Sequence, residues 1–231
     1  MKNHKSYLTN NPPNSIISLN GQNWVLSKMV IEELVKLLVK HKFPVFSLED
    51  LCTFYPKVKY DTLKKSLFRW KKKGWIAGLR RGLYELTFPS DLKLPDLYLA
   101  NKIYAPSYVS LETALSNYGI IPEVAMAVTS VTSKPTRRFK NQHGLFIYRT
   151  IQPQAFCGYQ IEKHNGHDVL IAEPEKALVD YLYLNTCRNT KFDAAAQRLD
   201  RKKIKKMNPK KIQTYAALYK LNLKQVFYAN L

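Results

Sequence analysis

The residues of this chain best suited to chemistry are basic, and ten of them lie between Lys57 and Arg81 beside one acidic residue, Asp61. A lysine offers a point charge that suits a phosphate oxygen, and the planar fork of an arginine matches the O6 and N7 atoms of guanine. A neutral helix that is merely solvated usually alternates the signs of its charges. The stretch therefore favours contact with a polyanion over a solvated surface.

The element that must position these charges is a helix predicted over Tyr60–Lys73, because Gly74 suits the residue that ends a helix. At about 100° per residue, one side collects the apolar residues that we expect to face the core: Tyr60, Leu63, Leu67 and Trp70. The opposite side carries the predicted DNA contacts: Thr62, Lys65, Arg69, Lys72 and Lys73. Arg69 is the predicted guanine contact, and the lysines are predicted to meet phosphates.

The segments before this helix supply the rest of a small module. Apolar residues at intervals of three and four predict a helix within Ser27–Lys42, followed by a short strand at Val45–Phe46. Ser47 and Asp50 match a capping box and predict the start of a helix over Leu48–Tyr55. Two helices and a strand therefore precede the basic helix.

A hairpin is predicted after the basic helix, over Trp75–Phe88, because Gly82 suits a turn that needs positive φ. Arg80 and Arg81 lie at its tip, where we expect them to reach a phosphate or an adjacent minor groove. The predicted order is helix, strand, helix, turn, helix, hairpin. This order is typical of a winged helix-turn-helix.

The net charge of +20 is unevenly distributed along the 231 residues. Residues 1–95 and 188–231 each carry a net +10, whereas residues 96–187 hold eight basic and eight acidic residues. A neutral segment between two basic ones indicates a packed domain flanked by surfaces with an electrostatic role. The total charge favours a polyanionic partner.

The neutral segment predicts a small α+β unit. Its predicted elements are a helix over 107–123 that ends at Gly119, strands over 124–134 and 144–151, a hairpin over 158–173 that turns at Asn165–Gly166, and a helix that begins at Pro174. The predicted fold class is therefore α+β, with an N-terminal winged helix-turn-helix, a small mixed α/β domain and a helical basic C-terminus.

The C-terminal segment is strongly basic, with eight basic residues and one acidic residue over Arg198–Lys211. The apolar residues between Tyr215 and Leu223 predict a helix that packs against another element. Two interpretations of the basic part stay open. It is either a solvated loop between two helices or a second contact with a polyanion.

The neutral segment gives no positive case for catalysis. Glu173 and Lys176 lack the spacing of the Glu-x-Lys found in metal-dependent nucleases. Cys157, His164 and His167 suggest a metal site less than they suggest ordinary polar residues beside a turn. The chain has no phosphate-binding glycine loop, no H-E-x-x-H and no G-x-S-x-G. We therefore predict that the protein is not an enzyme and binds no metal or cofactor.

Cysteine usage and the distribution of apolar residues indicate the cellular compartment in which we expect the protein. The chain has three widely spaced cysteines, an odd number that does not indicate a disulfide framework. Residues 1–14 lack the apolar core of a signal peptide, and no run of about 18 apolar residues occurs. We therefore expect a cytoplasmic protein with no membrane partner.

Four segments in order along the chain resemble the AbiEi family, the antitoxins of abortive-infection type IV toxin–antitoxin systems. They are "RRGLYEL" (80–86), "APSYVSLETALSNYGIIPE" (105–123), "SVTSKPTRRF" (130–139) and "IAEPEKALVDYLYL" (171–184). The likeness runs from about Ser27 to Leu184. It implies a phage-defence antitoxin and autorepressor whose winged helix binds the promoter DNA of its own operon. It also implies a functional antagonist, a nucleotidyltransferase-like toxin that the antitoxin need not bind directly.

The resemblance completes the predicted organisation of the chain. The parts are a flexible N-terminal segment (1–26), a winged helix DNA-binding domain (27–90), an α+β antitoxin domain (91–187) and a basic helical C-terminal segment (188–231). The candidates for antitoxin activity are Lys134, Arg137, Arg138, Arg201, Lys202 and Lys205. The alternative functions are a nucleic-acid-modifying enzyme with a winged-helix targeting domain and a general RNA- or DNA-binding protein.

Overall fold

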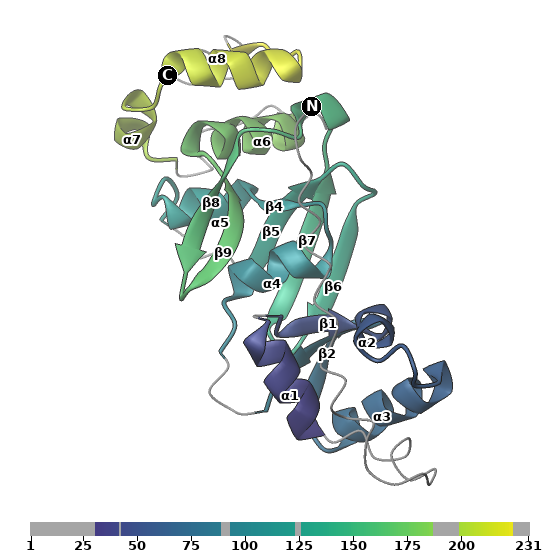
Figure 1. Cartoon of the computed structure of the whole chain (residues 1–231). Helices are drawn as coiled ribbons and strands as arrows, with labels where there is room; N and C mark the ends of the chain where they lie inside the picture. The colour runs from purple at the N-terminus through teal and green to yellow at the C-terminus, as the bar shows by residue number, and fades with distance from the viewer. Residues whose placement is uncertain (1–30, 42, 89–92, 123–125, 187–198, 224–231) are drawn as a thin grey trace, which may run out of the picture. The chain divides into compact units, whose positions relative to one another are not determined.

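The computed structural model describes residues 31–41, 43–88, 93–122, 126–186 and 199–223, and its helices and sheets form a mixed α+β protein (Figure 1). The chain divides into two compact units. The first comprises residues 1–78 and 82–91, and the second comprises residues 79–81 and 92–231. The predicted N-terminal segment 1–26 lies outside the described residues, as do residues 27–30 of the first predicted helix.

Residues 31–86, which belong to the first unit except for residues 79–81, contain three helices and a three-stranded sheet in the predicted order. The elements are α1 (Ile31–Lys40), β1 (Val45–Ser47), α2 (Leu48–Phe54), α3 (Tyr60–Lys72), β2 (Ile76–Arg80) and β3 (Leu83–Leu86). The strand order is β1-β3-β2, and Phe46 of β1 lies opposite Tyr84 of β3 in an antiparallel pair. The helices, the strand and the hairpin predicted from the sequence are therefore confirmed as elements.

Local sequence explains two of the boundaries in this unit. The side chain of Ser47 accepts a hydrogen bond from the Asp50 backbone N–H at 3.1 Å, and the Asp50 carboxylate accepts one from the Ser47 N–H at 2.7 Å. This capping box satisfies two backbone donors at the start of α2, as predicted. Gly82 adopts φ +77° between β2 and β3, a conformation that glycine reaches without strain.

The core of the first unit is mostly aliphatic, with the aromatic rings of Phe46 and Trp70. Its buried side chains include Leu34, Leu38, Phe46, Leu51, Leu63, Leu67, Trp70, Ile76 and Leu86. Each such side chain contributes roughly 1.5–3 kcal/mol when it leaves water. This burial fixes the side of α3 that faces inward, and hence the side that faces solvent.

The second unit is built on a six-stranded mixed sheet. Its strands are β4 (Tyr108–Val109), β5 (Ala127–Thr132), β6 (Arg137–Asn141), β7 (Gly144–Thr150), β8 (Tyr159–His164) and β9 (His167–Ala172). The order is β6-β7-β5-β4-β9-β8. Strand β5 pairs with β7 and β4 with β9 in parallel, and the remaining neighbours are antiparallel. Strands β6 and β8 therefore form the two edges.

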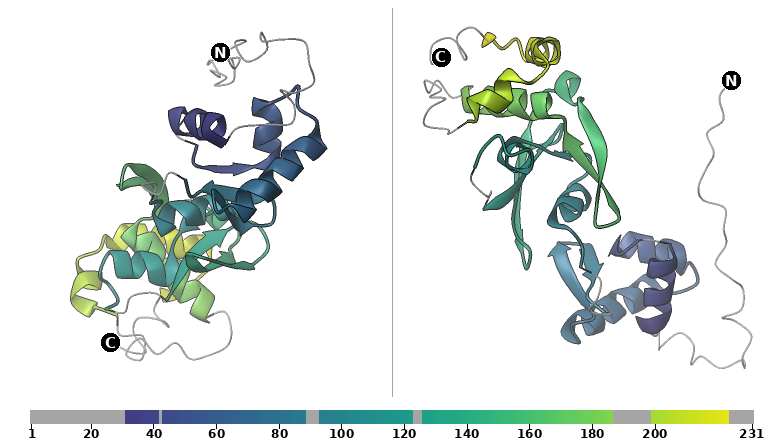
Figure 2. Two further views of the ribbon diagram at one scale, coloured as in Figure 1. Left: turned by 90° about the horizontal axis from the view of Figure 1, so that it is seen from below. Right: turned by 90° about the vertical axis from the view of Figure 1, so that its left-hand side faces the viewer.

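Helices pack against this sheet and against one another. They are α4 (Asp96–Ile103), α5 (Leu111–Asn117), α6 (Pro174–Thr186), α7 (Arg201–Lys205) and α8 (Pro209–Leu218), with a short 3-10 turn, η2 (Pro153–Ala155). Helix α5 packs against α6, and α8 packs against α6 and η2. Figures 1 and 2 show the yellow C-terminal helices beside the green α6 in each view.

The predicted elements of the second unit are partly corrected. The helix predicted over 107–123 is shorter, because Tyr108 and Val109 form a strand that bridges β5 and β9 and the helix begins only at Leu111. Helix α4 and strand β6 were not predicted. The hairpin that turns at Asn165–Gly166 and the helix that begins at Pro174 are confirmed.

Candidate nucleic-acid interface

Helix α3 presents a broad exposed face that is rich in basic residues and also carries Asp61 and Phe68. Its buried side chains are Leu63, Ser66, Leu67 and Trp70. At 100° per residue their mean direction from Tyr60 is about 290°, so the exposed face centres near about 110°. Lys65 and Lys72 lie within about 30° of that centre. The apolar stripe predicted from the sequence puts the centre of the exposed face at about 140° instead.

The predicted contact residues of α3 are exposed to differing degrees. Lys65, Arg69, Lys72 and Lys73 are exposed, and Thr62 is half-buried. Arg69 lies about 70° from the centre of the exposed face. One terminal nitrogen of its guanidinium, Nη2, donates to Ser66 Oγ at 3.1 Å. This bond uses one of the five guanidinium donors and orients the planar group on its own helix.

One residue of the predicted apolar stripe, Tyr60, does not face the core. Tyr60 is 55% exposed rather than buried with Leu63 and Leu67. Serine 66 takes the inward position instead and is fully buried. The inward direction is therefore rotated by about 30° from the one that Tyr60 suggested.

The charges of α3 lack carboxylate partners within the described part of the chain. None of its lysines or arginines makes an ion pair there within 4.0 Å. Two of the nearby ammonium groups lie over aromatic rings instead: Lys72 Nζ is 5.4 Å from the Phe68 ring centre, and Lys73 Nζ is 4.4 Å from that of Trp75. Positive charge that is not neutralised internally is available to an external anion.

Arg80 and Arg81 at the end of β2 are both exposed, and Arg80 is partly engaged. Leu79–Arg81 cluster with the second unit, and within it Arg80 Nε donates to the Ile103 carbonyl at 2.6 Å. Arg80 Nη1 also donates to the Arg81 carbonyl at 3.0 Å. The remaining guanidinium donors of Arg80 are the ones that could meet a phosphate.

The candidates for antitoxin activity lie on two separate elements. Arg137 and Arg138 are exposed on the edge strand β6, just after Lys134. Lys134 is held by its own unit, because its Nζ donates to the Ala105 carbonyl at 2.6 Å and lies 5.6 Å from the Tyr104 ring centre. Lys134 therefore fastens the turn before β6 as well as adding charge.

The other three candidates are exposed on α7: Arg201, Lys202 and Lys205. Asp200 caps this short helix by accepting from two backbone N–H groups. Its own N–H donates to the Ile120 carbonyl at 2.8 Å, and Lys203 Nζ donates to the Tyr118 carbonyl at 3.2 Å. Arg201–Lys205 of the basic stretch thus form a capped helix, bonded to the residues just beyond α5, rather than a loop, and the choice between a solvated surface and a second polyanion contact stays open.

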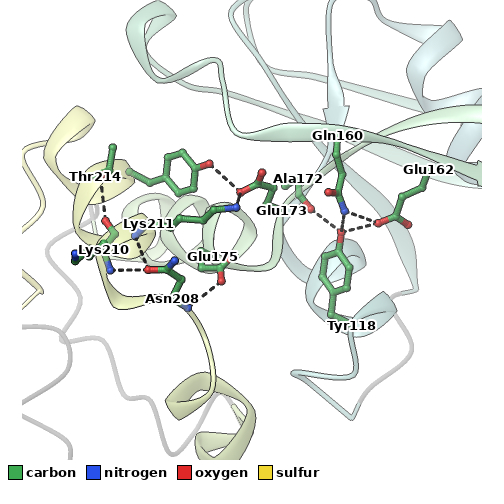
Figure 3. Close-up of polar contacts among 11 residues, drawn as sticks. Tyr118, Gln160, Glu162, Ala172, Glu173, Glu175, Asn208, Lys210, Lys211 and Thr214 are labelled. Atoms are coloured by element: carbon green, nitrogen blue, oxygen red, sulfur yellow. Dashed lines mark hydrogen bonds and ion pairs between the residues drawn. The ribbon is translucent and has the colours of Figure 1, made fainter.

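A carboxylate at the start of α6 anchors helix α8 (Figure 3). Glu173 Oε2 accepts from Lys211 Nζ at 2.8 Å and from Tyr215 Oη at 2.9 Å, and Glu175 accepts from the Asn208 N–H at 3.0 Å. Partial burial of Glu173 raises its pKa, but the two hydrogen bonds outweigh this and leave the pKa below its ordinary value. The acidic residues weighed as nuclease ligands therefore hold the C-terminal helix.

The ring of Tyr215 reaches Glu173 by passing over a glycine. A Cβ atom at Gly158, which has φ +72°, would lie 2.7 Å from the Tyr215 ring. Real Cβ atoms essentially never come this close to another heavy atom. Gly158 therefore permits the close approach of α8 to the start of β8.

A second anchor of α8 is a fully buried polar network. Lys176 and Asp180 form an ion pair within α6, and Tyr219 Oη lies 3.0 Å from Lys176 Nζ and 2.6 Å from Asp180 Oδ1. The other oxygen of Asp180 accepts from Tyr108 Oη and Ser110 Oγ. Every oxygen of the carboxylate is thereby satisfied in a site without solvent.

The protonation of this network follows from its burial. Burial lowers the pKa of the Lys176 ammonium, and the neighbouring Asp180 carboxylate opposes that shift. Burial and the same carboxylate raise the pKa values of Tyr108 and Tyr219, whose hydroxyls stay protonated and donate. The sequence signal for this pair was Lys176 and Asp180 at i and i+4 among apolar neighbours in "PEKALVDYLYL", a spacing that puts both on one helix face.

The two histidines weighed as metal ligands take other partners. His164 Nε2 lies 3.3 Å from Glu162 Oε2, and the His167 ring packs in a tilted arrangement against Tyr98 with 4.6 Å between ring centres. Among the described residues, no three His, Cys, Asp or Glu side chains gather as metal ligands would. Within the same residues, no helix has the length and apolar character that a bilayer crossing requires.

Comparison with models of known protein families and with curated proteins finds no match for this chain. The resemblance to the AbiEi antitoxins therefore stays a prediction based on four sequence segments. Three of these segments lie over described elements of the second unit, namely β4 with α5, β5 with β6, and β9 with α6.

Proposed function

We propose that the first unit is a winged helix that binds operator DNA, and that the chain is the antitoxin and autorepressor of a type IV toxin–antitoxin system. In this proposal α3 is the recognition helix, and the β2–β3 hairpin is the wing. The order α1-β1-α2-α3-β2-β3 and the pairing of β1 with β3 support this assignment.

The observation that carries the DNA-binding part is the exposed face of α3. Lys65 and Lys72 lie near its centre, Arg69 lies at its side, and none of the three makes an ion pair with a described carboxylate. A major groove admits a helix, and its phosphates attract such charges over roughly a Debye length. Arg69 supplies the planar donors for guanine, and the lysines supply phosphate contacts.

The test of this part is binding of the full chain to the duplex upstream of its own operon. With about six phosphate contacts, a plot of the logarithm of the binding constant against the logarithm of the salt concentration should have a slope of about −5. Arg69→Ala should weaken binding by about 1–3 kcal/mol and relax the preference at one base pair. Lys36→Ala, an exposed lysine of α1, is the matched control and should change little. A full chain that bound operator and scrambled duplexes equally would refute the proposal.

The antitoxin part rests on the second unit and on the resemblance. The exposed cations of β6 and α7, together with Lys134, are the residues proposed to oppose a nucleotidyltransferase-like toxin. In cells that express such a toxin from the same operon, Arg137→Ala with Arg138→Ala should reduce rescue of growth while operator binding persists. Arg69→Ala should give the opposite result, with rescue retained and repression lost. Variants that lost both activities together would contradict the assignment of operator binding to α3 and of antitoxin activity to the second unit.

The proposal contains no catalytic step. Glu173, Glu175 and Lys176, which an enzymatic alternative would use, bind α8 or lie in the buried network. Metal-dependent turnover of DNA or RNA by the purified chain, lost in Glu175→Gln, would favour the enzymatic alternative instead.

A further inference from the structure

Phe68 is a large apolar side chain that α3 turns toward solvent. It is 62% exposed, more than any other phenylalanine in the described part of the chain. Single exposed apolar residues are ordinary on protein surfaces and need no explanation by themselves. The position and the neighbours of Phe68 set it apart.

Phe68 lies near the centre of the exposed face rather than at its border. Its direction at 100° per residue is about 80°, compared with about 110° for the centre of the face. Lys72 lies near about 120° and Lys65 near about 140°, so the ring is nearer to the centre than Arg69. In a duplex that accommodates α3 in its major groove, Phe68 would therefore lie near the middle of the interface.

The surroundings of Phe68 are charged, which decides between the partners that could cover it. Lys72 Nζ lies 5.4 Å from the ring centre, and Lys64 and Lys65 are exposed one turn earlier. An apolar protein partner would have to strip water from these ammonium groups without pairing them. A polyanion pairs them, so charge complementarity favours DNA as the occupant of this face.

Within a major groove, the group that an exposed phenyl ring fits is the C5 methyl of thymine. The other base edges in that groove present hydrogen-bond donors and acceptors, which a phenyl ring cannot satisfy. The cation–π contact with Lys72 holds the ring on the helix and limits the side-chain freedom that binding would remove.

We propose that Phe68 contacts a thymine methyl group in the major groove and sets the base preference at that step, an inference that rests on the proposed DNA binding through α3. The lysines around the ring then supply affinity that is independent of sequence, and Phe68 and Arg69 divide the reading of base edges. Sequence preference would thus depend on one apolar contact and one guanidinium contact.

The experiment uses the full chain and a duplex enriched from a random pool by the wild-type protein. Each thymine of that duplex is replaced in turn by deoxyuridine, which removes only the methyl group. Wild-type protein should lose about fourfold in affinity at one or two adjacent positions, the effect expected from one buried methyl. Phe68→Ala should bind the thymine and deoxyuridine duplexes with equal, reduced affinity.

Phe88→Ala is the matched control, because Phe88 is also exposed in the first unit but lies outside α3. It should keep the full sensitivity to the methyl group. Thermal unfolding of both variants should stay within about 2 °C of wild type, because neither side chain is buried.

The outcomes separate the inference from the function on which it rests. Sequence-preferring binding in which Phe68→Ala keeps the wild-type response to deoxyuridine overturns the methyl contact and leaves the proposed function standing. Failure of the wild-type chain to enrich any duplex overturns the proposed function itself. A changed sedimentation mass of Phe68→Ala with unchanged DNA binding would assign the ring to a protein interface and also overturn the inference.

Discussion

Two regions of the chain, residues 1–95 and 188–231, each carry a net charge of +10, and the tertiary structure uses that charge differently. On α3 the lysines have no ion-pair partner among the described residues. On α8, Lys211 pairs with Glu173 and the neighbouring tyrosines reach carboxylates of α6 or its start. Regions of equal net charge thus differ: the cations of α3 face outward unpaired, whereas Lys211 of the other region anchors a helix.

The difference shows that net charge does not by itself identify a polyanion-binding surface. The deciding feature is whether carboxylates from elsewhere in the fold reach the cations. Glu173, just before α6, lies 38 residues from its cation partner Lys211. Helix α7 lies between these cases, because its exposed cations sit on a helix that is itself fastened to the second unit.

The largest expected effect comes from the buried side of this comparison. Asp180→Ala leaves the Lys176 ammonium without its carboxylate in a site with no solvent. We expect a loss of about 3–5 kcal/mol in the free energy of unfolding, measured by urea denaturation. Asp168→Ala is the control, because the Asp168–Lys163 pair is exposed on both sides and should contribute less than about 1 kcal/mol. Equal effects of the two substitutions would contradict the anchoring role of the network.

The next prediction compares the two basic helices directly. Lys65→Ala with Lys72→Ala should lower operator affinity and reduce the log–log salt slope by about two, because two phosphate contacts are lost. Lys202→Ala with Lys205→Ala, the corresponding pair on α7, should change the slope less. An equal reduction of the salt slope by the α7 double substitution would show that the C-terminal segment also contacts DNA. The contrast between the two regions would then rest on α8 alone.

A smaller effect tests the contact between α8 and the network. Tyr219→Phe removes only the hydroxyl that joins Lys176 and Asp180 to α8, and keeps the ring stacked on Tyr183 at 4.1 Å between centres. We expect about 1–2 kcal/mol lower stability in urea. Tyr159→Phe, at a more exposed ring, is the control and should be nearly neutral. A neutral Tyr219→Phe would mean that apolar packing alone holds α8.

The smallest effect concerns the ion pair of α8 and its pH dependence. The pKa of Glu173 in the folded protein lies below its ordinary value of 4.5, so the unfolded chain binds a proton first on acidification. The contribution of Glu173 to stability is therefore present above pH 4.5 and is lost as the pH falls through the folded-state pKa. The free energy that protects the α8 amides from hydrogen exchange should fall over that range by about 1 kcal/mol or less.

Glu173→Gln supplies the comparison for this prediction. It removes the titrating group and keeps a side chain that can still accept from Tyr215. The variant should show weaker protection of α8 at neutral pH and a smaller acid-dependent change than wild type. An unchanged acid response would assign the titration to another carboxylate.

Much of the fold was predictable from local sequence. Ser47 with Asp50, Gly82, Asn165–Gly166 and Pro174 each mark a boundary that the structure confirms, because capping and turn geometry depend on residues close together in the chain. Strand β4 was missed for the opposite reason. Two residues at Tyr108–Val109 become a strand only because β5 and β9 lie on either side of them.

The candidate site divides in the same way. The sequence alone determined that α3 is an amphipathic helix with basic residues opposite its apolar ones, because the helical repeat is a property of consecutive residues. It misjudged Tyr60 and overlooked Phe68, since the inward direction of a helix is set by the surface against which it packs. Which cations face outward unpaired, and that Lys211 meets Glu173, was decided only by the tertiary structure, because this ion pair joins groups 38 residues apart in the chain.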